Sequence, residues 1–427
     1  MRCFRCWLYQ PIINQYIHVC DCSTLPATSR VILAPFLSFI ASFYESREAF
    51  RQFLYRTGVL TATALPAPVI SISSLTPGSG KSPVVEYLAK HYWNHHGLPS
   101  LVVQLGSRGA ADETAMLLRS GFVGTPIKVE STASPIDIKD MLRQHASARL
   151  VLLDNGLQLS SNIQRDIDII TINSLSPVGN GHLKPRGTLR EPFRPALRRS
   201  DAVVFHHVDV AGREGLREVS HSLSSFLPRH ALQLQTQLTP VSLKSLVPRE
   251  KSLDMSEVQG LGEELGLSRL QGAAIVCITG IGCPKSLEEH LRRLGARHVE
   301  LYVGQSYQDS DGFFHIDDIE HAIHRVRELA SDSTYDHACI VMTEKDYARQ
   351  YGLWGSLFLK YVNEIIDTDD GDEHAVVSRG RSGWGAYVLH SDLHVVEHDR
   401  RFSSQKAMLA AMLRLAIDSY RRRSYVV

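Results

Sequence analysis

The sequence contains a glycine-rich run that could bind phosphate groups. Residues 76–82 read Thr-Pro-Gly-Ser-Gly-Lys-Ser, between an apolar stretch at 69–72 and a segment with helical spacing at 83–95. A loop of this kind directs backbone N–H groups and the positive end of a helix toward one anion. The pattern predicts a nucleoside triphosphate site, in which Lys81 neutralises the β- and γ-phosphates and Ser82 binds Mg²⁺. The expected nucleotide-binding residues are Thr76, Pro77, Gly78, Ser79, Gly80, Lys81 and Ser82.

The match to the phosphate-loop consensus is incomplete. The consensus has glycine at the first position, where this chain has Leu75. A glycine- and serine-rich turn with an exposed lysine is the alternative. The flanking strand and helix favour the phosphate site.

An acidic residue follows a second apolar strand. Residues 150–153 read Leu-Val-Leu-Leu and lead to Asp154, after which Asn155-Gly156 turns the chain. Phosphoryl-transfer sites use an acid at the end of a buried strand to hold magnesium. An aspartate in this position also forms turns. Together with the loop, it makes Asp154 and Ser82 the expected magnesium ligands.

Short apolar strands alternate with helix-length segments from residue 68 onward. The expected strands are 69–72, 100–105, 149–153, 168–172 and 201–205, followed by 273–279, 299–303 and 338–342. This alternation predicts an α/β fold, in which a P-loop NTPase-like parallel sheet carries helices on both faces. A polar stretch at 238–270 indicates a boundary, so we expect a core at 61–240 and a second, smaller α/β domain at 265–427.

Composition limits the class of protein. The 46 basic residues nearly balance the 45 acidic ones, which argues against a nucleic-acid binder. Hydrophobic residues make up 44% of the chain and charged residues 21%, as in folded globular proteins.

Three segments bear on membrane contact and targeting. The apolar run at 31–44 is too short to span a bilayer, which leaves core packing or a membrane interface. Residues 1–30 carry three arginines and one acid, a composition compatible with a transit extension. A predicted amphipathic helix at 403–423 ends in three arginines, which fit either a solvated helix end or an anionic membrane surface.

Several motifs together resemble the tetraacyldisaccharide 4′-kinase family. The most specific is Gly-Asn-Gly-His-Leu at 179–183 followed by Leu-Arg-Glu-Pro at 189–192. Further matching segments are 68–72, 107–109, 112–113, 153–158, 165–169, 201–204, 279–284 and 342–346. The resemblance covers roughly residues 32–395.

This resemblance implies a substrate and a set of roles. Family members use ATP and Mg²⁺ to phosphorylate the 4′-hydroxyl of a tetraacylated glucosamine disaccharide 1-phosphate at a membrane surface, which assigns residues 31–60 to the membrane interface. Asp112 matches the acid that deprotonates the sugar hydroxyl. His315 lies near the place of a histidine that assists that acid. Candidate substrate-binding residues are Asn180, His182, Arg190 and Glu191, for which a solvated polar loop is the alternative.

The chain departs from the family at positions that bear on activity. Asn155 stands where the family has a second magnesium-binding aspartate, and Gly312 stands where it has a histidine. A weakly active or inactive nucleotide- or lipid-binding homologue is therefore one alternative, and a kinase or ATPase for a small soluble substrate is another. The N-terminal extension suggests a mitochondrion, with the cytoplasmic face of a bacterial inner membrane as the alternative location.

Overall fold

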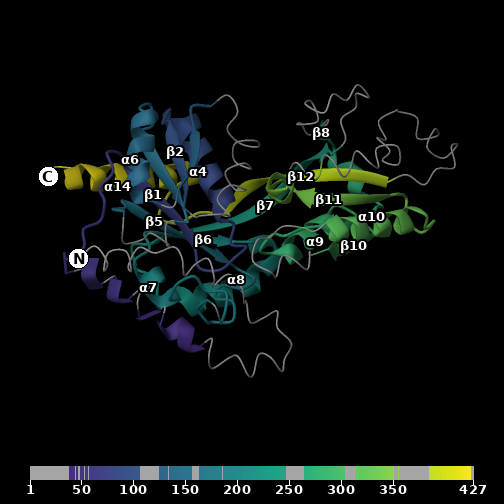
Figure 1. Ribbon diagram of the computed structural model, residues 1–427, viewed down its shortest axis with the longest axis horizontal. Helices are drawn as coiled ribbons and strands as arrows, with labels where there is room; N and C mark the ends of the chain where they lie inside the picture. The colour runs from purple at the N-terminus through teal and green to yellow at the C-terminus, as the bar shows by residue number, and fades with distance from the viewer. Residues whose placement is uncertain are drawn as a thin grey trace. The chain divides into compact units, whose positions relative to one another are not determined.

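The computed structural model divides the chain into two compact units. The first takes the described residues up to Gln237 and from Leu393 onward, and the second takes those from Leu238 to Asp392 (Figure 1). The structure describes residues 38–43, 45, 46, 49–51, 53–55, 57–105, 125–132, 134–155, 163–184, 186–246, 264–302, 314, 316–350, 354 and 384–424.

The first unit is built on a parallel sheet. Its strands are β1 (Val69–Ser74), β2 (Ser100–Leu105), β3 (Lys128–Thr132), β4 (Leu150–Asp154), β5 (Ile167–Asn173), β6 (Ala202–His206) and the first part of β7 (Leu232–Ser245), in the order β7-β6-β5-β1-β4-β2-β3. The central strands β1, β4 and β6 are buried along their whole length, as expected when helices cover both faces. The predicted α/β class is confirmed.

Helices cover the two faces of this sheet. On one face, α6 (Pro135–Gln144), α7 (Phe193–Arg198) and α8 (Val208–Ser224) pack on residues such as Val151, Ile170 and Phe205. On the other, α4 (Lys81–His96) and α14 (Gln405–Ser424) lie over Ile169 and Val204. The two groups of helices pack on different strand residues, because successive side chains of a strand point to opposite faces of the sheet.

The C-terminal helix belongs to the first unit. Residues from Leu393 onward belong to this unit, whereas the sequence pattern predicted them in a second domain at 265–427. The reason is that α14 buries Met408, Leu409 and Met412 and contacts β1 and β5. Of its terminal arginines, Arg421 and Arg422 are exposed, whereas Arg423 forms a 2.9 Å ion pair with Asp166.

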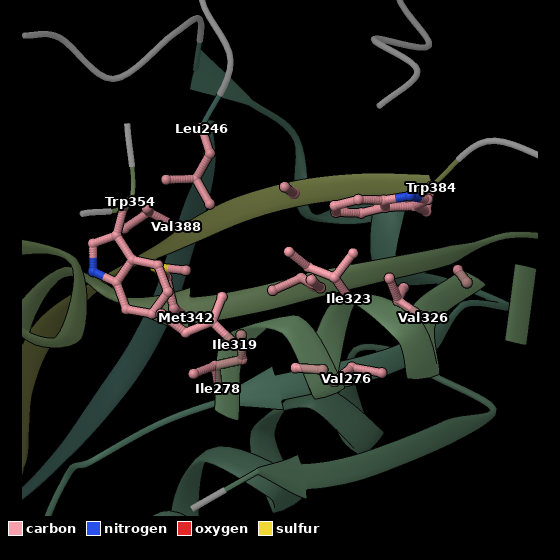
Figure 2. Packing of buried hydrophobic residues seen from close by; sticks show 14 of the residues in the cluster. Leu246, Val276, Ile278, Ile319, Ile323, Val326, Met342, Trp354, Trp384 and Val388 are labelled. Atoms are coloured by element: carbon pink, nitrogen blue, oxygen red, sulfur yellow. The ribbon is translucent and has the colours of Figure 1, made fainter. Parts of the chain in front are cut away.

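The second unit is a smaller α/β structure. Its parallel strands β9 (Ala274–Ile278), β10 (His298–Tyr302), β11 (Ala338–Thr343) and β12 (Trp384–Glu397) have the order β10-β9-β11-β12. They are accompanied by α9 (Pro284–Arg293), α10 (Ile316–Ala330) and α11 (Glu344–Arg349), a short strand β8 (Glu264–Leu265) and the 3₁₀ turn η3 (Leu267–Leu270). Figure 2 shows Ile319, Ile323 and Val326 of α10 packed toward the strands and Trp354 at the edge of the same core.

The predicted boundary at 238–270 contains regular structure at both of its ends. β7 continues to Ser245, and β8 pairs with it in an antiparallel manner. Residues 247–263 lie outside the described part of the chain.

Candidate active site

The glycine-rich run connects β1 to α4, as the sequence predicts. Gly78 and Gly80 both adopt a φ of 70°, a left-handed conformation that costs residues with a Cβ about 1–2 kcal/mol. Gly80 is the residue before the first turn of α4, a helix of 16 residues that begins at Lys81. The backbone N–H groups at this helix start are the donors that a phosphate requires.

Lys81, Ser82 and Asp154 converge at the carboxyl end of the sheet. Asp154 is the last residue of β4 and lies opposite Ile72 of β1 and Gln104 of β2. The Lys81 ammonium forms an ion pair with Asp154 Oδ1. The Ser82 hydroxyl donates to Asp154 Oδ2 at 3.3 Å, and the Gln104 amide donates to the same oxygen at 3.1 Å.

The pair is almost fully buried. The Lys81 side chain is 6% exposed and that of Asp154 is 0% exposed. A charge in such an environment needs a partner, because desolvation of an unpaired ion costs several kcal/mol. The structure therefore brings together the three residues that were predicted to bind phosphate and magnesium, and it adds Gln104.

The segment 174–191 lies against the phosphate loop. The Arg190 backbone N–H donates to the Leu75 carbonyl at 3.1 Å, and the Thr76 hydroxyl donates to the Ser176 carbonyl at 3.5 Å. Gly179 has a φ of 55°, and a Cβ there would lie 2.0 Å from the Thr188 hydroxyl. This close packing within the segment requires glycine at position 179.

Arg190 contacts Asn155, the residue that follows Asp154. Its guanidinium donates to Asn155 Oδ1 at 2.5 Å, and Asn155 has a φ of 67°. Asparagine tolerates this left-handed conformation better than most residues. Arg190 thereby contacts the residue that directly follows Asp154, the carboxylate paired with Lys81.

The other predicted substrate residues have different surroundings. Glu191 is buried and forms an ion pair with Arg199. Asn180 and His182 are exposed, and Asn180 Oδ1 accepts from the His182 backbone N–H at 3.2 Å. The Asn180 amide also donates to the Arg186 carbonyl at 3.3 Å, so this side chain holds its own loop.

The ion pair of Glu191 belongs to a wider buried network on the first unit. Arg165 donates to Asp168 at 2.7 Å. Burial lowers the pKa of Arg165, a shift that the carboxylate of Asp168 opposes. Burial raises the pKa of Asp201, because it disfavours the charged form of a carboxyl group as it does that of a guanidinium. Asp201 also accepts a hydrogen bond from the Asp168 backbone N–H.

Two predicted catalytic residues, Asp112 and His315, lie outside the described residues, as does Gly312.

Two histidines beside the loop were not predicted from the sequence. His206 ends β6, and His207 follows it with a φ of 62°. His207 Nε2 lies 3.0 Å from the Gly78 carbonyl oxygen, and a Cβ on Gly80 would meet the His206 ring at 2.3 Å. The available signal was a pair of polar residues directly after the apolar strand predicted at 201–205, at the sheet edge that carries the loop.

A buried aspartate organises the second unit. Asp346 is fully buried and accepts from the Thr279 hydroxyl and the Gly280 N–H, both at 2.9 Å, and from the Thr343 hydroxyl at 2.7 Å. Thr279 follows β9, and Thr343 ends β11. Asp346 thus joins the carboxyl ends of two neighbouring strands, and it connects the motifs at 279–284 and 342–346.

A parallel α/β sheet with a phosphate loop after its central strand, and an acid at the end of the neighbouring strand, defines the class of P-loop nucleotide-binding proteins. Comparison with known proteins narrows this class. The family model described as tetraacyldisaccharide-1-P 4'-kinase matches residues 33–372. The chain belongs to the tetraacyldisaccharide 4'-kinase family, and the resemblance seen in the sequence is confirmed.

Relatives span most of the chain. A protein of Arabidopsis thaliana named "probable tetraacyldisaccharide 4'-kinase, mitochondrial" is 30% identical over 364 residues, which are 79% of this chain and 86% of that protein. A tetraacyldisaccharide 4'-kinase of Halothermothrix orenii is 28% identical over 330 residues, 73% of this chain and 81% of its own length.

One solved structure shares the fold. The crystal structure of LpxK from Aquifex aeolicus, in complex with ATP, superposes with a TM-score of 0.55 at 18% identity. The alignment covers 90% of this chain and 98% of that one.

Proposed function

We propose that this protein transfers the γ-phosphate of ATP to the 4′-hydroxyl of a tetraacylated glucosamine disaccharide 1-phosphate. The observation that carries the proposal is the convergence of Lys81 and Ser82 of α4 on Asp154 of β4, in a chain whose relatives are named for this reaction. A P-loop ATPase would need the same loop. The segment 174–191, which carries the motif most specific to the family, lies beside that loop and favours the kinase over a general ATPase.

The start of α4, Lys81 and Arg190 have separate tasks in this reaction. The backbone N–H groups at the start of α4 bind the phosphate oxygens. The Lys81 ammonium neutralises the charge that develops on the transferred group, and the protein supplies mainly such positioning and electrostatic stabilisation. Arg190, held by Asn155 at 2.5 Å, adds a second cation next to this centre.

The donor set suits magnesium. Asp154 offers a carboxylate and Ser82 a hydroxyl, the hard oxygen ligands that Mg²⁺ prefers, and Mg²⁺ commonly takes only one or two carboxylates together with substrate phosphates. Within the described ranges no cluster of three or more His, Cys, Asp or Glu side chains could hold a metal by itself. We therefore assign Asp154 and Ser82 as the residues that hold Mg²⁺, which supplies charge neutralisation when bound.

The acceptor side rests on the resemblance. Asp112 is proposed as the general base for the sugar hydroxyl, with His315 as its assistant. Asn180, His182 and Arg190 are proposed to contact the substrate. Glu191 is proposed to act through the segment that its ion pair with Arg199 holds in place.

The N-terminal helical region supports contact with a membrane surface. Residues 38–43, 45, 46, 49–51 and 53–55 are helical, and Phe39, Phe43, Phe50 and Phe53 are 47–72% exposed. On a helical wheel drawn at 100° per residue, these four positions fall within a sector of about 80°. Exposed aromatic stripes of this kind insert into the interface of a bilayer. Among the described residues, no helix is both long and apolar enough to cross a membrane.

A vesicle assay tests the membrane proposal. The wild type is expected to float with liposomes of phosphatidylcholine and cardiolipin, because its phenylalanine face can insert. A variant with Phe39→Ser and Phe43→Ser should remain in the soluble fraction. Equal flotation of the two proteins would disprove the role of this face.

We further propose a mitochondrial location, supported by the plant relative that is named mitochondrial. Residues 1–30 would act as the transit extension. A fluorescent protein fused behind residues 1–60 should collect in mitochondria, and the same fusion without residues 1–30 should not.

The transfer reaction itself is tested with the intact chain. We supply ATP labelled in its γ-phosphate, Mg²⁺ and the tetraacyldisaccharide 1-phosphate in detergent, and we separate the lipids by thin-layer chromatography. The wild type should yield a labelled lipid that Lys81→Ala does not. Lys90→Ala is the matched control, because Lys90 lies on the same helix and pairs at 2.7 Å with Glu86 away from the loop. A folded wild type without labelled lipid would refute the proposal, and so would a product that persists in Lys81→Ala.

A further inference from the structure

His207 contacts the phosphate loop, and none of the roles proposed above belongs to it. Its Nε2 lies 3.0 Å from the carbonyl oxygen of Gly78. A carbonyl oxygen only accepts hydrogen bonds, so Nε2 must carry the proton and donate it. The side chain is buried, with 4% of its surface exposed.

The contact fixes the direction of one peptide plane in the loop. In a trans peptide the C=O of one residue and the N–H of the next point in opposite directions. A Gly78 carbonyl that is held toward His207 therefore turns the Ser79 N–H to the opposite side. Gly78 has a φ of 70° and no side chain, so the residue itself does little to prevent this plane from rotating.

His207 is itself held firmly. The preceding residue, His206, ends a buried strand, and its carbonyl accepts from the Ser174 N–H at 2.9 Å. His206 also forms a 2.9 Å hydrogen bond with Thr236 of β7, and its ring lies 4.2 Å from that of His207. The anchor for Gly78 is thus part of the sheet core.

We propose that His207 is a positioning residue for nucleotide binding, which orients the Gly78–Ser79 peptide so that the Ser79 N–H faces the phosphates. This inference rests on the proposed ATP-binding function of the loop. His207 does not touch the nucleotide. It acts through the backbone of Gly78.

Two substitutions at one position separate the hydrogen bond from the bulk of the side chain. His207→Gln keeps an N–H donor at about the reach of Nε2, whereas the amide of His207→Asn ends near the place of Nδ1. Asparagine also tolerates the left-handed backbone at this position, with a φ of 62°, at least as well as glutamine does. Backbone strain therefore cannot explain a weaker Asn variant.

We measure ATP binding by isothermal titration and steady-state kinetics in the lipid transfer assay. His207→Asn should weaken ATP binding roughly three- to tenfold, the loss expected for one hydrogen bond. The KM for ATP should rise by the same factor while kcat changes little, because the loop holds the phosphates in both the ground state and the transition state. His207→Gln should restore most of the affinity.

The opposite pattern overturns the inference. Wild-type affinity in His207→Asn, or equal weakening in the two variants at unchanged thermal midpoints, would show that the hydrogen bond does not orient the loop. A measurement on the wild type covers the case in which a variant fails to fold. The ¹⁵N spectrum of histidine-labelled protein should show His207 with its proton on Nε2, and a proton on Nδ1 would contradict the assigned donor.

Lys81→Ala in the same titration separates this inference from the proposed function. Binding in the wild type that Lys81→Ala removes, together with full binding in His207→Asn, would refute the role of His207 alone. A wild type that binds no ATP would refute both proposals.

Discussion

Replacement of Gly80 by alanine would place a methyl group against the ring of His206. A Cβ at this position lies 2.3 Å from His206 Cδ2 and 2.5 Å from both Cγ and Nε2. The ring has little room to move, because His206 is fully buried and bonded to Thr236 at 2.9 Å. Gly80 also has a φ of 70°, which alanine adopts only with strain.

Two costs add to give the expected loss of stability. The left-handed backbone costs alanine about 1–2 kcal/mol. Overpacking against a fixed ring costs a further 1–3 kcal/mol or so, which gives about 2–5 kcal/mol in total. Gly97→Ala is the matched control, because Gly97 ends the same helix with a φ of 60° and its Cβ would meet nothing within 4 Å. That control should lose only the backbone part.

Urea unfolding of four proteins measures the steric part. Gly80→Ala, His206→Ala, the double variant and the wild type form a cycle, whose coupling free energy should be roughly 1–3 kcal/mol, since removal of the ring relieves the clash. ATP binding should weaken in Gly80→Ala and remain in Gly97→Ala. The reasoning is refuted if Gly80→Ala costs no more than Gly97→Ala, or if the coupling free energy is near zero.

Three further changes address other parts of the molecule. Asp346→Asn should lower the free energy of unfolding by about 3 kcal/mol, because a buried hydrogen-bond acceptor loses its charge. The exposed Asp336→Asn should change this free energy little. Urea unfolding followed by tryptophan fluorescence measures both variants, and equal values would contradict the role of Asp346. Arg423→Ala should cost about 2–4 kcal/mol by leaving a buried carboxylate unpaired, and a similar loss in the exposed Arg422→Ala would argue against this explanation. Burial and the neighbouring imidazoles lower the pKa of His91 to about 4, so the unfolded chain binds the proton first as the pH falls below about 6.5. Acidification from pH 7 to pH 5 should then cost the wild type about 2 kcal/mol that His91→Phe does not lose, as measured by urea midpoints at both pH values; an equal loss in both proteins would refute it.

Local patterns predicted much of the fold. The strands expected at 100–105, 168–172 and 338–342 correspond to β2, β5 and β11, because continuous apolar runs are typical of strands buried on both faces. The C-terminal helix was predicted at nearly its observed length, but its unit was not. Its apolar side could have packed on any exposed sheet face, and periodicity does not indicate which one.

The candidate site was also predicted only in part from the sequence. The sequence by itself determined the loop, since Gly78 and Gly80 permit left-handed backbone where a strand passes into a helix. Only the tertiary structure decided which distant residues contact the loop. Asp154 reaches Ser82 across 72 residues of chain, and His207 reaches Gly78 across 129, because parallel pairing brings the carboxyl ends of β1, β4 and β6 to one edge. Strand order depends on packing between distant segments, which no local pattern of residues specifies.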